Sequence, residues 1–592
     1  MRRFCAVCLS LSAFVLLAAG AAPAEDTCTD AELILRGGKI VTMDAAGRIA
    51  QALAVRDGRI LAVGSDDEIN RCAGAHTEVI DLAGRTVLPG LIDVHTHALD
   101  WAKSILRGEL DLRYPAVRAI GDIVRLVGER VAATPEGAWV IGSGWDDAQL
   151  AERRYPTRRD LDAVSPRHPV YLVHISGHLA AANSAALARA GITRETPEPA
   201  GGVIERDAAG EPTGIVKDTA MALVARHLPA DPPDLALRAA KLVSEKALEV
   251  GLTTIHDIYL SPDDMRAYQE ARRRGWLKVR VQMVPGVGSL KDAEEVIRMG
   301  VHTGFGDEQL KLGAVKVFAD GGMGARTIAI YPPGVAGEPA AAGRPRHSTL
   351  AGRPENVGLL IWKTEELQQA HRLLAAAGWQ ITTHAIGDRA MDQVLDSYAA
   401  TIKALNLDAP RFRIAHGGLS TPAIQKRLRA LGVLVETNPA FVYWIGSWFE
   451  KYGPERVRWA YPGKSYVENG IIAAGASDVG VTPLSPWWGI WAAVVRREMR
   501  SGKVLAPEER LTVLEALRLY TRNAGYLGFE EAVKGSLEPG QLADFIVVDR
   551  DVLAVPPDQL KDVRVLMTFL SGHLAFERPQ PTAFTTRVKP TD

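Results

Sequence analysis

The sequence is poor in cysteine. Its 592 residues include only four, and Cys5 and Cys8 lie in the apolar N-terminal leader. Neither Cys28 nor Cys72 has a partner at metal-ligand spacing, so we expect no thiolate in the chemistry of this chain. In an oxidising compartment these two residues can form a disulfide, but two buried thiols fit the sequence equally well.

The chain also lacks net charge. Lys and Arg number 69 against 70 Asp and Glu, which gives a formal charge of -1. No global field would attract a polyanion, so we expect neither nucleic acid nor an anionic membrane surface as a partner. A small-molecule substrate is expected instead. The sequence leaves the oligomeric state open, a homo-oligomer included.

Long apolar runs are absent beyond the leader. The first 24 residues start with Arg2 and Arg3, continue in a short apolar run and end in Ala22-Pro23-Ala24. This pattern predicts a signal peptide over 1–24, cleaved after Ala24. A membrane anchor is the alternative, but the run is shorter than the roughly 20 residues that a bilayer requires. We therefore predict an exported protein, periplasmic or secreted, with no stable membrane anchor after cleavage.

Both ends of the mature chain carry short β-branched runs broken by glycine turns. AELILRGGKIVTMD and AQALAVRDGRILAVGS lie near the start, and GSLEPGQLADFIVVDRD and VRVLMTFLSGHLAFE lie near the end. These runs predict antiparallel strands joined by tight turns. We expect residues 25–87 and 531–592 to form one small β-sandwich.

The middle of the chain alternates helical patterns with buried strand patterns, as in TEELQQAHRLLAAAGWQITTHAIGD. This alternation predicts an α/β fold, a (β/α)8 TIM-like barrel over residues 88–530. The eight expected strands are 88–94, 252–256, 279–284, 314–318, 380–383, 412–415, 433–436 and 471–474. Residues 101–233 fall between the first two strands, so they predict an inserted subdomain that opens onto the active-site mouth.

The first expected barrel strand ends in LPGLIDVHTH. Side chains two apart on a strand share a face, so Asp93, His95 and His97 point the same way. Two neutral imidazoles at a barrel mouth are suitable ligands for zinc and similar divalent ions. By itself, one His-x-His pair is weak support for a metal site.

Later strands end in polar residues too: Lys316 (GAVKVFADGG), His384 (QITTHAIGD), His416 (RFRIAHGG) and Asp478 (IIAAGASDVG). Singly, each has a structural explanation: Lys316 can pair with Asp320, the histidines can be core residues, and Asp478 can cap a helix. Their recurrence at strand ends around one barrel favours a metal site.

The order His-x-His, Lys, His, His and Asp, with a sandwich made from both termini, resembles the amidohydrolase superfamily. The phrases AVRDGRILAVG, VLPGLIDVHTH, KVFADGGMGARTIAI, SGHLAAANSAAL and GSLEPGQLADFIVVD are most similar to amidohydrolase family 3, the YtcJ-like metal-dependent hydrolases. The resemblance covers nearly all of the mature chain.

This resemblance implies one or two divalent metal ions, with zinc expected. His95 and His97 would bind the more buried ion, His384 and His416 the second, and an N-carboxylated Lys316 would bridge them. Asp478 would bind the first ion and act as general base and acid while a metal-activated hydroxide attacks a carbonyl. An unmodified Lys316 would leave a mononuclear site.

Other residues are candidates for substrate contact or support. His178 in SGHLAAANSAAL is expected to bind substrate or to cap the following helix. Arg326 is expected to bind a substrate carboxylate or to hold Asp320. His256 and Asp257 end the second strand as candidate hydrogen-bond partners of the site. The aromatic runs NPAFVYWIGSWFEKYG and SPWWGIWAAVV fit either a substrate pocket or helix packing.

The implied activity is metal-dependent hydrolysis of a carbon-nitrogen bond other than a peptide bond: an amide, an N-formyl group or a cyclic amide. Deamination of a heterocycle is the alternative on the same scaffold. It is disfavoured because His384 begins HAIGD, without the HxxE pattern of familiar deaminases. A catalytically inactive metal- and ligand-binding relative is the third possibility, but Asp478, whose loss would mark it, is present.

Overall fold

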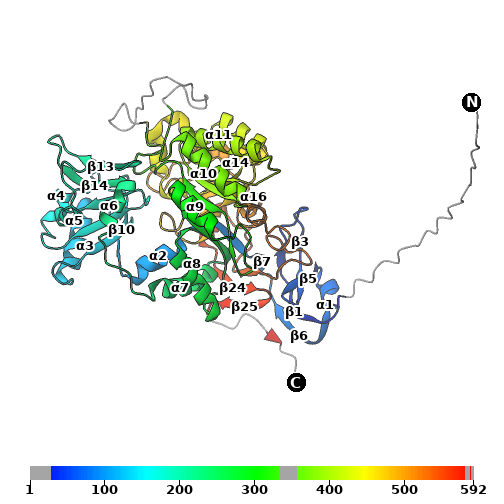
Figure 1. The fold of residues 1–592 in the computed structure, drawn as a ribbon. Coiled ribbons are helices and arrows are strands. Elements are labelled where there is room, and N and C mark those ends of the chain that lie inside the picture. Colours follow the sequence, from blue (N-terminus) through cyan, green and yellow to red (C-terminus); the bar gives the residue numbers. More distant parts are fainter. Residues whose placement is uncertain (1–27, 332–356, 580–586, 589–592) are drawn as a thin grey trace, which may run out of the picture.

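The computed structural model describes residues 28–331, 357–579 and 587–588. Figure 1 shows their arrangement: a barrel with surrounding helices, a β-sandwich at one side and a separate subdomain at the other. The predicted signal peptide at 1–24 lies outside the described residues. Within the described ranges, no helix combines the length and apolar character that crossing a membrane requires.

Eight parallel strands form the barrel, and all eight overlap the strands expected from sequence. In spatial order they are β8 (Leu91–Thr96), β15 (Leu252–Leu260), β16 (Arg280–Val287), β18 (Val315–Phe318), β19 (Ile381–Ala385), β20 (Arg413–His416), β21 (Leu434–Thr437) and β22 (Ala473–Gly475). The short strand β17 (Leu310–Leu312) adds to the edge of β16. The ring closes where the Asp478 N–H donates to the His95 carbonyl, 2.9 Å away. The predicted TIM-like barrel is confirmed.

Helices between the strands cover the outside of the barrel (Figure 1). They include α7 (Leu235–Glu249), α8 (Pro262–Arg273), α9 (Leu290–Arg298), α10 (Thr364–Ala376), α11 (Asp388–Leu405) and α12 (Pro422–Leu431). Local signals define their ends: Ser261 and Thr421 accept hydrogen bonds from backbone N–H groups of α8 and α12. Proline follows each of these caps, where its fixed φ suits the first helical turn.

Both ends of the chain build the β-sandwich. One sheet has the order β26 (Arg587–Val588), β6 (Ala73–Asp81), β1 (Ala31–Arg36), β4 (Ala52–Arg56) and β5 (Arg59–Gly64). The other has the order β25 (His573–Glu577), β24 (Val565–Leu570), β23 (Phe545–Val548), β7 (Thr86–Pro89), β2 (Lys39–Val41) and β3 (Ile49–Ala50). Leu35, Val55, Val87 and Phe545, among others, form the shared core.

The sandwich differs from expectation in two respects. Its sheets are mixed rather than antiparallel: in one, β6 returns beside β1 in parallel after the short helix α1 (Asp66–Asn70), and in the other β7 pairs with β2 in parallel. Leu88 pairs with Ile546 in the sandwich, so the barrel strand begins at Leu91 instead of Leu88. The apolar run 86–94 thus contributes β7 to the sandwich and the start of β8 to the barrel, with Gly90 between the two strands.

The segment between β8 and β15 forms the inserted subdomain. After helix α2 (Ala98–Leu106), its sheet has the order β13 (Gly202–Arg206), β14 (Pro212–Asp218), β12 (Leu179–Ala182), β11 (Val170–His174), β10 (Val140–Trp145) and β9 (Leu110–Asp111). Apolar side chains on both faces of this sheet are buried in cores of their own. The subdomain therefore places a preformed wall beside the barrel, drawn in cyan in Figure 1.

A disulfide joins Cys28, shortly before β1, to Cys72, directly before β6, and the two are 44 residues apart in sequence. Of the two alternatives left by the sequence, the structure has the bonded one. Closing a loop of this length restricts the unfolded chain.

We predict that Cys72→Ala destabilises the sandwich by about 2–4 kcal/mol, because the unfolded chain regains the freedom of that loop. Denaturant unfolding of the mature protein without reductant would measure the change. Cys28→Ala should have the same effect, and the double variant should lose no more than either single variant. A wild-type unfolding curve unmoved by full reduction would contradict this expectation.

Candidate metal centre

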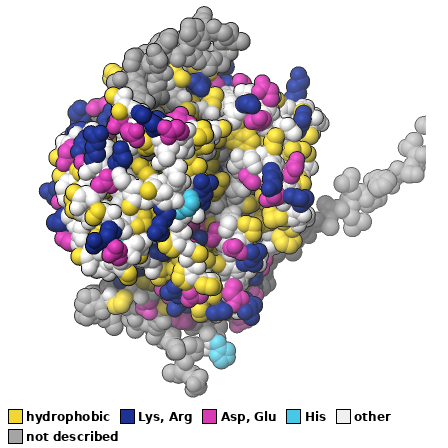
Figure 2. All heavy atoms as spheres, turned by 60° about the vertical axis from the view of Figure 1, so that its left-hand side comes forward, with side chains coloured by type: hydrophobic (Ala, Val, Ile, Leu, Met, Phe, Trp, Pro, Cys, Tyr) yellow, Lys and Arg dark blue, Asp and Glu magenta, His cyan; other side chains and the backbone are white. Residues whose placement is uncertain are grey.

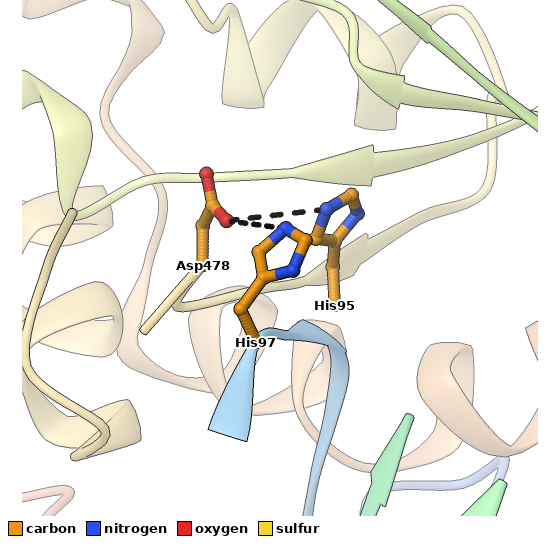
Figure 3. Close-up of side chains that lie close together, drawn as sticks. All are labelled: His95, His97 and Asp478. Carbon is orange, nitrogen blue, oxygen red and sulfur yellow. Dashed lines mark ion pairs between the residues drawn. The ribbon is translucent and has the colours of Figure 1, made fainter. Parts of the chain in front are cut away.

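Two histidines and an aspartate meet where β8 and β22 end. His95 lies in β8, His97 follows it directly, and Asp478 lies three residues beyond β22. Asp478 Oδ1 is 3.5 Å from His97 Nε2 and 4.0 Å from His95 Nε2. Figure 3 shows both imidazoles facing the carboxylate. This spacing suits ligands of one divalent ion, and the three atoms form a candidate metal site.

The other predicted ligands border the same point. Lys316 Nζ lies 3.2 Å from His95 Nε2. The His416 ring centroid is 4.9 Å from that of His95 and 4.6 Å from that of His384. The barrel thus brings together all six predicted metal ligands. Three of them form the candidate site, and the other three, Lys316, His384 and His416, lie beside it.

Protein partners orient three of the imidazole rings. His95 Nδ1 lies 2.7 Å from Glu436 Oε2, and His416 Nδ1 lies 2.9 Å from Asn438 Oδ1. His384 Nε2 donates to the Gly321 carbonyl at 3.1 Å. Each contact assigns the ring proton to one nitrogen and leaves a lone pair on the other.

The donor set fits a divalent cation. His384 Nδ1 is buried and has no hydrogen-bond partner among the described residues. A buried imidazole nitrogen without a partner is costly unless a ligand uses its lone pair. Neutral imidazoles held through their second nitrogen, together with one carboxylate, are the usual ligands of zinc.

Burial sets the protonation of these groups. It lowers the pKa of His95, His384 and His416 well below the usual histidine value. It also lowers the pKa of Lys316 to about 8, although Glu436 and Asp478 oppose this shift. Burial raises the pKa of Asp478, against the effects of His97 and Lys316. The histidines are therefore neutral near pH 7, as metal ligands must be.

Glu436 is a supporting residue that sequence reasoning missed. It ends the seventh barrel strand and is completely buried. One oxygen contacts His95, while Oε1 accepts hydrogen bonds from Thr382 (2.9 Å) and Arg413 (3.2 Å). Its position at a strand end was the only available signal, because its partners are far away in the sequence.

Asp93 and Asp257 have structural positions. Asp93 accepts hydrogen bonds from the backbone of His95 and Ser477, so it fixes the loop of Asp478 against β8. Asp257 accepts from the N–H groups of Ala98 and Leu99, at the start of α2. Its carboxylate thus caps that helix instead of contacting the metal ligands.

His256, the neighbour of Asp257, reaches the site only indirectly. Its Nδ1 lies 3.3 Å from Arg413 Nη1, and Arg413 in turn binds Glu436. Burial lowers the pKa of His256 to about 3, so the ring is neutral.

Arg326 lies beside the inserted subdomain. Its Nη2 is 3.3 Å from Asp147 Oδ2, and its guanidinium lies over the rings of Tyr155 and Trp448. The expected contact with Asp320 is absent: that carboxylate accepts backbone N–H groups of residues 329, 386 and 387. The expectation that Arg326 holds Asp320 is therefore wrong.

Asp146, Asp147 and His174 form a second group with metal-ligand composition. His174 Nε2 lies 3.6 Å from Asp146 and 3.7 Å from Asp147. The Ser176 N–H points to His174 Nδ1 at 3.0 Å, which places the ring proton on Nε2, between the carboxylates. With Arg326 on Asp147, this group is a buried ion cluster that joins the subdomain to the barrel loops.

Two cavities meet above the candidate metal ligands. The larger, of about 690 Å³, lies between the barrel mouth and the inserted subdomain, and Trp101, Tyr171 and Phe318 contribute to its wall. The smaller is lined by apolar side chains that include Met323, Phe441 and Trp448. His178, His384, His416 and Asp478 border both. Figure 2 shows the face that carries the subdomain, where hydrophobic side chains lie among charged ones.

The two aromatic runs have different positions. Phe441, Ile445 and Trp448 of the first run line the smaller cavity. In the second run, Trp487 and Trp491 are buried in helix α15 (Pro486–Val495) as part of the main core. The first run therefore both packs in the main core and borders a cavity, whereas these two residues of the second run pack in the core.

Comparisons with known proteins agree with this geometry. The sequence profile of the Amidohydrolase family matches residues 78–576. The putative amidohydrolase YtcJ of Bacillus subtilis is 31% identical over 554 residues, which cover 92% of this chain and 99% of that protein. An N-substituted formamide deformylase of Arthrobacter pascens is 30% identical over 556 residues, with 92% and 98% covered.

The fold has relatives of known structure. An uncharacterised metal-dependent hydrolase from Pyrococcus horikoshii superposes with a TM-score of 0.68 at 24% identity, over 89% of this chain and 99% of that one. The profile match spans most of the chain, and the relatives match almost end to end. This chain belongs to the amidohydrolase family.

Proposed function

We propose that this protein is a metal-dependent hydrolase that cleaves a carbon-nitrogen bond in an amide, an N-formyl group or a cyclic amide. The main support is the convergence of His95, His97, Lys316, His384, His416 and Asp478 beneath a cavity of about 690 Å³. That volume suits a small organic substrate. The relative named N-substituted formamide deformylase favours amide or formamide chemistry.

The residues present would hold one or two divalent ions, for which we propose zinc. His95, His97 and Asp478 would hold the first, and His384 and His416 the second. We propose that N-carboxylated Lys316 bridges them, since a buried ammonium among cations is unfavourable and a carbamate supplies anionic oxygens. When bound, such ions lower the pKa of water and polarise a carbonyl oxygen.

Asp478 is the proposed proton carrier. Its carboxylate faces His95 and His97 and borders both cavities. Its position beside the candidate ligands and the cavities places it within reach of the attacking water and of the leaving nitrogen. Asp478 would take a proton from the attacking water and return it to the leaving nitrogen.

The residues after His384 support amide hydrolysis over deamination of a heterocycle. Asp388, the last residue of HAIGD, accepts a hydrogen bond from the Tyr331 N–H and lies 3.8 Å from Arg456. Its carboxylate is thus engaged with the outer loops rather than with the metal ligands.

We also propose export to the periplasm or the medium. The leader pattern over 1–24 supports it, as does a disulfide between Cys28 and Cys72, which persists in oxidising compartments.

The first prediction concerns metal content. We expect two ions per chain when the protein is purified with bicarbonate and zinc, and one in Lys316→Ala. Metal-free protein given ¹³C-bicarbonate should show a carbamate signal that grows as pH rises through about 8, where Lys316 becomes neutral. Elemental mass spectrometry and ¹³C NMR would measure both. Two ions in the alanine variant, with no carbamate in wild type at any pH, would exclude the bridge.

The second prediction concerns Glu436. Glu436→Gln should weaken zinc binding by roughly 10- to 100-fold, because the His95 ring loses the carboxylate that orients it. Competition with a chelator of known affinity would measure this loss. Glu509→Gln is the matched control, since Glu509 is also buried but contacts Ser465, away from the ligands. Equal zinc affinities in the two variants would refute a role for Glu436 in metal binding.

The third prediction concerns Asp478. Asp478→Asn should lower kcat for an amide substrate by about 10² to 10⁴, because the proton carrier is lost. Steady-state kinetics at matched metal content would test this, with Asp100→Asn at the cavity rim as control. Unchanged hydrolysis in Asp478→Asn would show that another group moves the proton.

A further inference from the structure

His178 projects from the inserted subdomain toward the candidate metal ligands. It lies in the turn between β11 and β12, and its ring centroid is 5.1 Å from that of His384 and 6.1 Å from that of Phe318. It borders both cavities, and its side chain is 17% exposed. It is one of the two imidazoles that the subdomain contributes to these cavities, with His174.

Asp218 fixes the orientation of this ring. Its Oδ1 lies 2.8 Å from His178 Nδ1, and its backbone N–H donates to the His178 carbonyl at 2.9 Å. A carboxylate at Nδ1 assigns the ring proton to that nitrogen. With the ring proton on Nδ1, the lone pair lies on Nε2.

The backbone around this pair is under conformational constraint. Asp218 has φ 48° and ψ -125°, an unfavourable region for a residue with a side chain. A Cβ at Gly321 would come within 2.7 Å of Asp218 Oδ1, and one at Gly322 within 2.8 Å of the His178 ring. These glycines let the loop after β18 pack directly against the pair, so the ring is held from two sides.

No described residue hydrogen-bonds to His178 Nε2, and its ring borders the space above His384 and His416. An acceptor in this place can accept a hydrogen bond from a substrate N–H. In a trans secondary amide, the N–H and C=O bonds point in opposite directions. A substrate whose carbonyl oxygen faces the metal ligands thus points its N–H away from them, into the cavity that His178 also borders.

We propose that His178, oriented by Asp218, accepts a hydrogen bond from the N–H of the scissile amide and makes the enzyme selective for secondary amides. This inference rests on the proposed function and narrows its substrate class. A tertiary amide has no N–H and would leave the acceptor unpaired, which weakens binding and turnover.

The test compares pairs of substrates that differ only in the N–H. Formanilide and acetanilide are each measured beside their N-methyl derivatives, and kcat/KM for the secondary amide is divided by that for the tertiary one. We expect wild type to favour the secondary amide by about 10- to 100-fold. His178→Phe, which keeps a flat ring without an acceptor, should bring this ratio close to 1, mainly by slowing the secondary amide.

Two further variants separate the hydrogen bond from folding. His178→Gln keeps a side-chain acceptor and should retain part of the selectivity, whereas Asp218→Asn should lower it by releasing the ring. Ser104→Ala, another change in the wall of the large cavity, is the matched control and should keep the wild-type ratio. Metal content and thermal unfolding of each variant show whether the site remains intact.

The outcomes distinguish this inference from the proposed function. If all variants hydrolyse amides with the wild-type ratio, the role of His178 is refuted while the hydrolase assignment stands. A ratio near 1 in wild type refutes the selectivity in the same way. If fully metal-loaded wild type cleaves neither amide of either pair, the proposed function fails, and the inference fails with it.

Discussion

The cost of burying ionisable groups governs the barrel mouth. His95, Lys316, His384 and Glu436 are at most 1% exposed, and His95 lies 2.7 Å from Glu436 and 3.2 Å from Lys316. Such a group is stable only if its members are neutral, paired or bound to a cation. Burial makes the histidines neutral and brings the pKa of Lys316 to about 8. The same dry environment that imposes this cost would strengthen electrostatic interactions with a bound ion and substrate.

Charge compensation continues below the site, inside the barrel. Glu436 is the fully buried carboxylate beside the His95 ring, and Arg413 is its cationic partner. Arg413 in turn donates to Gln380 and to the Leu527 carbonyl. This chain of contacts fixes the Glu436 carboxylate, which fixes the His95 ring. The position of one candidate ligand thus depends on Arg413 of β20, on Gln380 just before β19 and on Leu527 at the end of α17 (Arg522–Leu527).

Local patterns were sufficient to predict the barrel and the strand ends. Each barrel strand is a short buried run between helices, and the side-chain alternation along it places His95 on the face of Asp93. The contacts that complete the site join residues far apart in the chain: 341 residues separate His95 from Glu436, and 179 separate Arg326 from Asp147. A single sequence carries no local signal for such pairs. The parallel pairing of β1 with β6 was not predicted for the same reason, since it depends on a crossover through α1.

The proposed metal ligands and the proposed specificity residue lie in different parts of the fold. The proposed ligands all belong to the barrel, whereas His178 and Asp218 belong to the subdomain sheet, with β12 and β14 paired between them. Arg326 and the buried cluster of Asp146, Asp147 and His174 hold that sheet against the barrel loops. The subdomain and the barrel are closely packed at Gly321. Its carbonyl accepts a hydrogen bond from His384, and its Cα lies against Asp218. Changes in the subdomain can therefore alter the cavity wall without moving a ligand, but only while the loop after β18 keeps its glycines.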